Sequence, residues 1–279
     1  MAYYNFSGKL LDINTGISIN NRAFRYADGL FESMYFTNGK IMFLQQHYAR
    51  LRNGMEVLRI DTDNLPSIDE IEHLAKKLIA ANEIETSARI RMQVFRKAGG
   101  LYLPEDNTCD YIIEATALNN TEYQLNTKGL HIGISNSIKR NANIFSQIKT
   151  TAKQDMVLVA MDAKDNKWDD AILMNNSDSI VETSSSNIFA VINGNIYTPT
   201  LSDGALNGIM RQNIIEIAKQ NKLSVIETSL NESNLLTADE IFISNAVKGI
   251  QWVVAFGTKR YFNSMSKNII SLLNKKINE

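Results

Sequence analysis

The spacing of apolar residues predicts two amphipathic helices in the first third of the chain. The first is indicated by five apolar residues at alternating intervals of four and three positions: Leu44, Tyr48, Leu51, Met55 and Leu58. This spacing places them on one face of an α-helix. Ser67 and Glu70 match a capping box, in which each side chain bonds a backbone N–H of the first turn. Apolar positions with helical spacing continue from Ile71 to Ile79, so we expect a second helix there.

A different period, with apolar and polar residues alternating, predicts a half-exposed strand from Arg89 to Phe95. Arg89 and Arg91 would share one face of this strand, and Arg96 would lie at its end. Such arginines are often solvated, but they can also bind a carboxylate through two parallel hydrogen bonds. Residues 110–117 and 131–135 are two further predicted strands.

Two Asn-Gly pairs predict β-hairpins, because these residues tolerate the positive φ angles of a tight turn. Asn38-Gly39 would be followed by a return strand over residues 41–44, and Asn193-Gly194 joins two apolar segments near the middle of the second half. The second hairpin is preceded by Glu182 and a run of hydroxyl residues. It is followed by a turn at Gly208 that leads into a helical pattern. A helix N-terminus offers backbone N–H groups to an anion such as phosphate.

Strands and helices alternate on both sides of the polar stretch between Leu118 and Lys128. This pattern predicts an α/β fold in two halves. We expect an N-terminal α/β domain over residues 1–120, a linker over 121–128, and a C-terminal domain over 129–279.

Composition narrows the classes of function. The 279 residues include 29 basic and 30 acidic side chains, so no overall field favours nucleic acid. No apolar run approaches the roughly 20 residues of a membrane helix, and we expect a cytoplasmic protein without membrane or nucleic-acid partners. The single cysteine, Cys109, excludes an intrachain disulfide and a multi-cysteine metal site, and we expect no metal. Its neighbours are not basic, so we expect an unreactive thiol.

The order of motifs from Ile180 to Arg211 resembles the C-terminal half of the fold-type IV pyridoxal-phosphate enzymes, the class IV aminotransferase family. The most specific strings are Ser185-Ser186-Asn187-Ile-Phe and Leu206-Asn-Gly-Ile-Met-Arg211. The resemblance extends from about Phe24 to the C-terminus. It implies two α/β domains with pyridoxal 5′-phosphate in the cleft between them, and a homodimer.

Lys149 sits where this family has its Schiff-base lysine, although a lysine before a helix is ordinarily just exposed. By the same resemblance Glu182 would pair with the pyridine nitrogen, and Arg50 would bind the phosphate. The backbone amides of Ile209 and Met210 would complete the phosphate site. The full set of implied cofactor-binding residues is Arg50, Lys149, Glu182, Ser186, Asn187, Gly208, Ile209, Met210, Asn245 and Ala246. Lys149 and Glu182 are the implied catalytic residues.

The chain departs from the family pattern at two places. Many members have a threonine where this chain has Ala246, which leaves only a backbone contact there. Relatives usually have an asparagine three or four residues after the lysine, where this chain has Ala152 and Lys153.

The resemblance implies transfer of an amino group from an amino acid to a 2-oxo acid. The alternative is a 4-amino-4-deoxychorismate lyase, which releases pyruvate and gives 4-aminobenzoate. Substrate residues would be Phe31, Arg91 and Arg96: Arg91 matches a position of the branched-chain branch, and Arg96 the carboxylate-binding arginine of the D-amino-acid branch. Which arginine binds the substrate stays open. A non-enzymatic protein that kept the fold is disfavoured because Lys149 and Glu182 are present. A nucleotide-phosphate hydrolase that uses the Gly208 turn is disfavoured, because this chain lacks the glycine-lysine-serine/threonine loop that such enzymes need.

Overall fold

The computed structural model describes residues 2–278, which divide into two compact units. The first unit runs to Thr121 and also includes Ile148–Ala152. The second contains Glu122–Gln147 and the chain from Lys153 onward. The chain therefore passes from one unit to the other three times.

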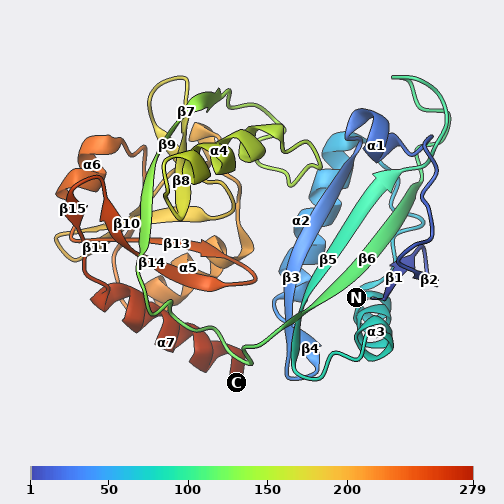
Figure 1. Ribbon diagram of the computed structural model, residues 1–279, viewed down its shortest axis with the longest axis horizontal. Coiled ribbons are helices and arrows are strands. Elements are labelled where there is room, and N and C mark those ends of the chain that lie inside the picture. The colour runs from blue at the N-terminus through green and yellow to red at the C-terminus, as the bar shows by residue number, and fades with distance from the viewer. Residues whose placement is uncertain (1, 279) are drawn as a thin grey trace. The chain divides into compact units, whose positions relative to one another are not determined.

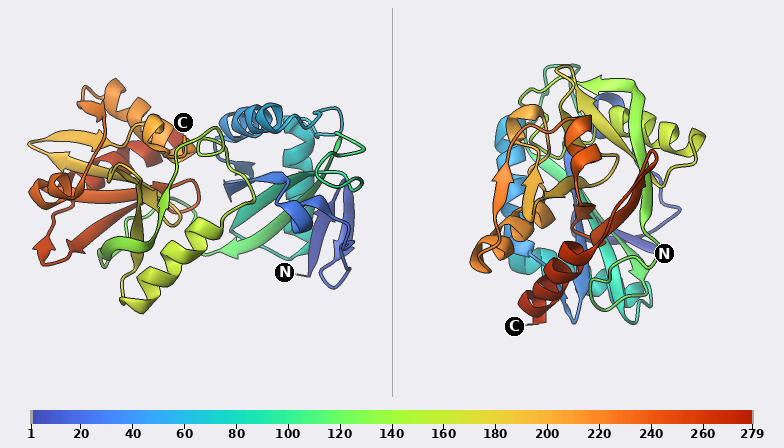
Figure 2. Two further views of the ribbon diagram at one scale, coloured as in Figure 1. Left: turned by 90° about the horizontal axis from the view of Figure 1, so that it is seen from above. Right: turned by 90° about the vertical axis from the view of Figure 1, so that its left-hand side faces the viewer.

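The first unit is an antiparallel six-stranded sheet in the order β2-β1-β6-β5-β3-β4 (Figure 1). Helices α2 and α3 lie along the same face of this sheet (Figure 2). Its elements are β1 (Tyr3–Phe6), β2 (Lys9–Asp12), α1 (Arg22–Tyr26), β3 (Gly29–Thr37), β4 (Lys40–Ile41), α2 (Leu44–Leu58), α3 (Ile68–Ala81), β5 (Ser87–Arg96) and β6 (Cys109–Leu118).

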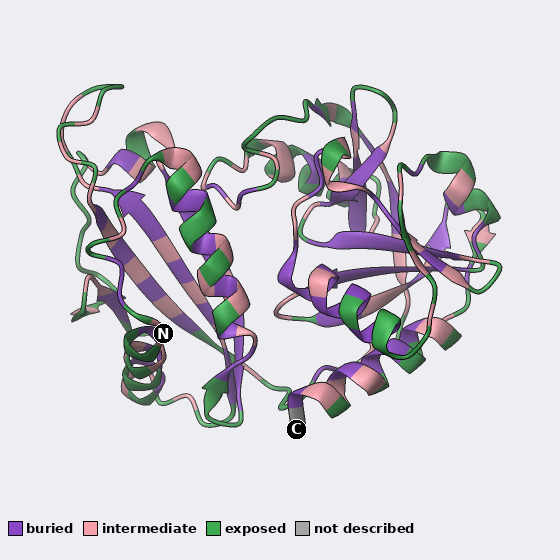
Figure 3. Cartoon of the chain, turned by 180° about the vertical axis from the view of Figure 1, so that it is seen from behind, coloured by how far each residue is buried: buried purple, intermediate pink, exposed green. Residues whose placement is uncertain are grey.

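The alternating pattern of β5 sorts its side chains between the two faces of the sheet. Ile90 and Met92 are fully buried in the core under α2 and α3, whereas Arg89 and Arg91 are half-buried on the opposite face. Figure 3 shows the resulting bands of buried and intermediate residues along the strands. The predicted strand and its shared arginine face are confirmed.

Both predicted helices of this unit are present. α2 buries Leu44, Leu51 and Met55 of its apolar stripe. α3 begins with the complete Ser67–Glu70 capping box. The predicted return strand over residues 41–44 is wrong beyond Ile41, because Phe43 turns the chain with a φ of 56° and Leu44 already belongs to α2. The apolar side chain of Leu44 packs into the core between the helices and the sheet of this unit.

The second unit is built on a nine-stranded mixed sheet in the order β12-β11-β10-β13-β14-β7-β8-β9, with β15 paired to β14. Its strands are β7 (Leu130–Arg140), β8 (Asp170–Asn175), β9 (Ile180–Thr183), β10 (Asn187–Ile192), β11 (Asn195–Thr198), β12 (Val225–Glu227), β13 (Glu240–Asn245), β14 (Gly249–Phe256) and β15 (Lys259–Arg260). Its helices are α4 (Gln154–Asp165), the short 3-10 helix η1 (Leu201–Asp203), α5 (Ile209–Gln220), α6 (Glu232–Thr237) and α7 (Ser264–Asn278).

The predicted hairpin at Asn193-Gly194 is confirmed. It joins β10 to β11, and both turn residues have positive φ angles, 49° and 77°. On its other side β10 pairs with β13, in a register that places Asn187 opposite Ser244. The start of β10 and the end of β13 therefore lie side by side, close to the end of β9.

The short segment 148–152 pairs with the start of β3 in the first unit. The N–H of Phe31 donates to the carbonyl of Lys149, and the N–H of Thr151 donates to the carbonyl of Gly29, both at 2.9 Å. Gly29 also approaches β5 closely, since a Cβ atom there would lie 2.6 Å from the carbonyl oxygen of Val94. These contacts fix the backbone of Lys149 beside β3.

Within residues 2–278 we find no helix with the length and apolar character needed to span a bilayer. Cys109 is buried, and burial raises the pKa of its thiol to about 11. This thiol is therefore protonated at neutral pH, as expected for an unreactive cysteine.

Candidate active site

Lys149 and Arg91 lie against the same aromatic ring. The ammonium nitrogen of Lys149 is 4.4 Å from the centroid of the Phe31 ring, and the guanidinium carbon of Arg91 is 4.1 Å from it. Both distances are typical of cation–π contacts. Three residues singled out in the sequence are thus brought together on the half-exposed face of the first sheet.

Arg50 lies next to Glu32, the carboxylate that follows Phe31 in β3. Its Nε donates to Glu32 Oε1 at 2.8 Å and its Nη2 to Oε2 at 2.5 Å. His47, one turn earlier on α2, contacts the same Oε2 through Nδ1 at 2.6 Å. Glu32 was not predicted, although a single charged residue inside the apolar run of β3 signals a buried partner.

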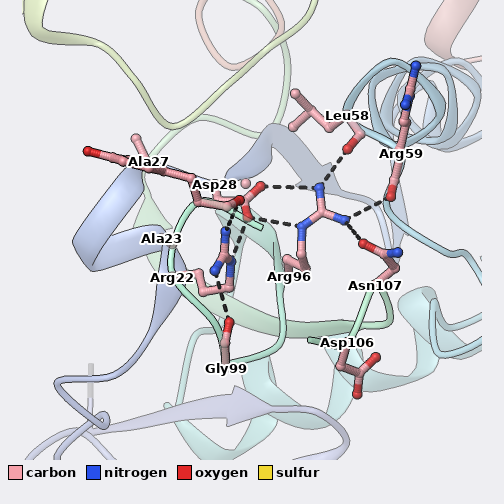
Figure 4. A network of polar contacts seen from close by, with 12 residues as sticks. Arg22, Ala23, Ala27, Asp28, Leu58, Arg59, Arg96, Gly99, Asp106 and Asn107 are labelled. Atoms are coloured by element: carbon pink, nitrogen blue, oxygen red, sulfur yellow. Dashed lines mark hydrogen bonds and ion pairs between the residues drawn. The ribbon is translucent and has the colours of Figure 1, made fainter. Parts of the chain in front are cut away.

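Arg96 is enclosed in a separate network at the end of β5 (Figure 4). It donates to the carboxylate of Asp28, to the backbone carbonyls of Leu58 and Arg59, and to the side chain of Asn107. Only 6% of the residue is exposed. Asp28 also accepts from Arg22, whose guanidinium bonds the carbonyls of Gly99 and Leu101. These contacts give Arg96 a structural role in holding the 97–108 connection, rather than a position open to substrate.

Glu182 in β9 is held by a buried arginine that sequence reasoning did not find. Arg140, the last residue of β7, donates through Nη1 to Glu182 Oε1 at 2.5 Å and through Nη2 to Asp155 at 2.6 Å. Burial by itself would lower the pKa of Arg140, but the two carboxylates outweigh it and the pKa lies above the ordinary value. Arg140 could not be identified from a local sequence pattern, because its partner Glu182 is 42 residues away in the sequence.

The turn before α5 connects Glu182 to the helix N-terminus. The N–H of Leu206 donates to Glu182 Oε2 at 3.2 Å, and its carbonyl accepts from Asn187 Nδ2 at 2.9 Å. Asn187 lies against Gly208, the residue before α5, where a Cβ atom would come within 2.0 Å of Asn187 Oδ1. A larger residue at this position would therefore displace the Asn187 side chain, although the φ of −66° is available to any residue.

The first turn of α5 has the features of an anion site. The N-cap residue before it, Gly208, provides no side-chain cap, and the turn contains no acidic residue. The first N–H groups of any helix, here those of Ile209 and Met210, have no acceptor within the helix. The macrodipole adds partial positive charge.

Ser186 and Asn245 extend this group along the end of the sheet. Asn245 Nδ2 donates to Ser186 Oγ at 3.0 Å. The carbonyl of Ala246, next to Asn245, accepts from the hydroxyl of Tyr123 at 2.8 Å. The predicted cofactor residues of the second unit therefore form one connected set around Glu182 and the α5 N-terminus.

Residues 29–256 match the family model described as Amino-transferase class IV. The chain belongs to the class IV aminotransferase family. This confirms the resemblance proposed from the motifs, and it makes the protein an enzyme of the aminotransferase family.

Individual relatives agree with this family. The chain is 28% identical over 275 residues to the "Probable branched-chain-amino-acid aminotransferase" of Aquifex aeolicus, covering 94% of this chain and 87% of that protein. It is 28% identical over 233 residues to a D-alanine aminotransferase of Listeria monocytogenes, covering 82% and 78%. A solved structure from Legionella pneumophila, provisionally named a 4-amino-4-deoxychorismate lyase, superposes with a TM-score of 0.84 at 26% identity, covering 94% and 96%. The predicted α/β fold of fold-type IV enzymes is confirmed.

Proposed function

We propose that this protein is a pyridoxal-phosphate-dependent aminotransferase that moves an amino group from an amino acid to a 2-oxo acid. The observation that carries the proposal is the connected set around Glu182: a buried carboxylate joined through Leu206 and Asn187 to an uncapped helix N-terminus. This donor set fits the cofactor, because a carboxylate suits a protonated ring nitrogen and a helix N-terminus suits a phosphate.

Pyridoxal phosphate, when bound, supplies an electrophilic carbon for amines and a ring that withdraws electrons from the substrate α-carbon. Lys149 provides the amine that would attach there, and its Nζ would carry the proton to and from the α-carbon. Glu182 would hold the proton on the ring nitrogen, and Arg140 orients that carboxylate through its Nη1 contact with Oε1. The carboxylate of Glu182 can accept a further hydrogen bond besides those from Arg140 and Leu206.

Arg50 and the backbone N–H groups of Ile209 and Met210 would bind the phosphate. Ser186, Asn187, Gly208, Asn245 and Ala246 would shape the remaining cofactor contacts. Arg91 is the better of the two arginines for a substrate carboxylate, because it is half-exposed and contacts the Phe31 ring, which Lys149 also contacts. Arg96 is left out of the proposed substrate site because its donors are already bonded.

A lyase acting on 4-amino-4-deoxychorismate is the second candidate. The similarity to the Legionella structure over nearly the whole of both chains favours it. The relatives named for branched-chain amino acids and D-alanine favour transamination.

One titration separates these functions. The purified protein loaded with cofactor is mixed separately with branched-chain L-amino acids, D-alanine and aminodeoxychorismate. Conversion of the visible cofactor band by one amino acid, with return of the band on adding a 2-oxo acid, identifies the aminotransferase and its handedness. Pyruvate release from aminodeoxychorismate alone identifies the lyase. Borohydride reduction followed by mass spectrometry should place the cofactor on Lys149, and Lys149→Ala should lose this label; a label retained by that variant excludes the assignment.

We further propose a cytoplasmic homodimer. The exposed apolar side chains of Phe24, Leu101, Tyr102 and Leu103 support an association surface on the first unit, since between 73% and 89% of each is accessible. Light scattering of the purified protein at about 63 kDa, twice the chain mass of 31.4 kDa, is expected; a mass of one chain contradicts the dimer. Cell fractionation tests the location.

A further inference from the structure

Glu32 is the only charged residue of β3, and just 2% of it is exposed. It points to the helix side of the sheet, where both of its oxygens accept from Arg50 and one also contacts His47. Two parallel N–H···O bonds of this kind fix both the direction and the plane of a guanidinium.

His47 completes the set by supporting the carboxylate. A carboxylate only accepts hydrogen bonds, so Nδ1 of His47 carries the proton in this contact. Burial lowers the pKa of His47, in opposition to the attraction of Glu32, and the ring stays neutral at physiological pH. Its Nε2 is buried without a hydrogen-bond partner, which lowers the stability of the folded state.

We propose that Glu32 is a positioning residue that holds the Arg50 guanidinium in the orientation needed to bind the anionic end of the cofactor. His47 acts through Glu32 by fixing its carboxylate. The inference rests on the proposed function, since it assumes that Arg50 meets the cofactor phosphate. Neither Glu32 nor His47 touches the cofactor in this proposal.

Orientation and charge make opposite predictions about Glu32. Its negative charge offsets the positive charge of Arg50, so removing it would strengthen attraction to phosphate if charge alone mattered. If orientation dominates, removing it leaves a long side chain to be ordered when the anion binds, and affinity falls.

The test compares two ligands in the full-length protein: pyridoxal 5′-phosphate and pyridoxal, which lacks the phosphate. Glu32→Gln is expected to weaken the binding of pyridoxal 5′-phosphate by about tenfold or more, because a charge-assisted pair is lost. Its affinity for pyridoxal should stay within about twofold of wild type. Glu56→Gln, the same change at an exposed position of α2, is the matched control and should alter neither affinity. Tighter or unchanged binding of pyridoxal 5′-phosphate to Glu32→Gln overturns the proposal.

Arg50→Lys gives an independent answer if Glu32→Gln does not fold. Lysine keeps the charge but cannot make the paired bonds to Glu32. We expect this variant to lose phosphate-dependent affinity, and near wild-type affinity would show that orientation is unimportant. Failure of the wild-type protein to bind pyridoxal 5′-phosphate would instead refute the proposed function. A wild-type protein that binds it while both variants bind equally well refutes only the role of Glu32.

Discussion

Charged side chains buried in either unit have several partners each. Arg96 binds one carboxylate, two carbonyls and one amide, and Arg140 binds two carboxylates and the carbonyl of Gly204. Such multiple pairing is expected, because an ion taken out of water must recover its hydration energy from protein groups. The number and type of partners separates a structural arginine from one that can receive a substrate.

The two candidate arginines of β5 should therefore respond differently to replacement. Arg96→Met is expected to lower the free energy of unfolding by about 3 kcal/mol, since two backbone carbonyls lose this donor and Asp28 keeps only Arg22 as a cationic partner. Arg91→Met removes a half-exposed charge and should cost less than about 1 kcal/mol, while raising the KM for the amino acid substrate.

Urea unfolding of both variants and steady-state kinetics test this contrast. A stable Arg96→Met protein with a raised KM would return Arg96 to the substrate site. Arg89→Met, on the same face as Arg91, is the matched control for a general effect of lost charge.

The pH dependence of stability is set partly by Glu32 and His47. Burial by itself would raise the pKa of Glu32, but Arg50 and His47 outweigh it and lower the pKa to about 2 from an ordinary value of 4.5. The unfolded state therefore takes up a proton first as pH falls, and stability is lost below about pH 5. The lowered pKa of His47 has the same sign, beginning near its ordinary value of 6.5.

We expect the unfolding free energy of the wild type to fall on acidification, with Glu32 contributing a loss of up to about 3 kcal/mol as the pH approaches 2. Glu32→Gln should show a shallower slope between about pH 5 and pH 3, because its side chain has no proton to gain. Urea unfolding at several pH values measures both slopes. Equal slopes would mean that Glu32 is not ionised in the folded protein at low pH.

Helices, strands and turns were predictable wherever one local pattern was enough. The stripe of α2, the capping box of α3 and the Asn193-Gly194 hairpin each depend on residues close in sequence. The prediction failed at residues 42–44, where the same apolar letters suit a strand and a helix. Packing against the core decided in favour of the helix.

At the N-terminus of α5, the addition of one methyl group to Gly208 is expected to affect cofactor binding. Gly208→Ala would place a Cβ atom 2.0 Å from Asn187 Oδ1 and push that side chain away from Leu206. We expect weaker cofactor binding, by about tenfold, because the turn that presents the helix N–H groups loses its bond from Asn187 to the Leu206 carbonyl.

Gly16→Ala is the matched control, since its added Cβ atom has no neighbour within 4 Å. Titration of each cofactor-free variant with pyridoxal 5′-phosphate gives the affinities. Wild-type affinity in Gly208→Ala would show that the turn adjusts without affecting the site.

On the scale of the whole molecule, the path of the chain decides where Lys149 lies. The segment 148–152 follows β7 and precedes α4, both in the second unit, yet it pairs with β3 of the first. Thr151 secures it through its N–H to Gly29 and its hydroxyl to the carbonyl of Ala27 at 2.7 Å. The position of the proposed catalytic amine therefore depends on an interaction between distant parts of the sequence.

Thr151→Pro removes both of these donors and should release the segment. The backbone N–H of Phe31, which donates to the carbonyl of Lys149, is then expected to exchange with deuterium at least about tenfold faster. Attachment of the cofactor to Lys149 should fall in parallel.

Hydrogen exchange followed by mass spectrometry or NMR measures the first effect, and borohydride trapping the second. Thr151→Ser keeps both donors and is expected to behave as wild type. Unchanged protection of Phe31 in Thr151→Pro would show that other contacts hold the segment.

The sequence by itself determined helices α2, α3 and α5, several strands, the main hairpin and the family, because these depend on periodicity, turn chemistry and short motifs. It also brought Lys149, Glu182 and Arg50 forward as candidates, and their roles stay predictions. Only the tertiary structure decided that Arg96 is bonded to Asp28, that Arg140 holds Glu182, and that Glu32 holds Arg50. Arg96 and Asp28 are 68 residues apart, and Arg140 and Glu182 are 42 apart. Pairing across such separations leaves no local pattern, since it is created by the packing that brings the strands together.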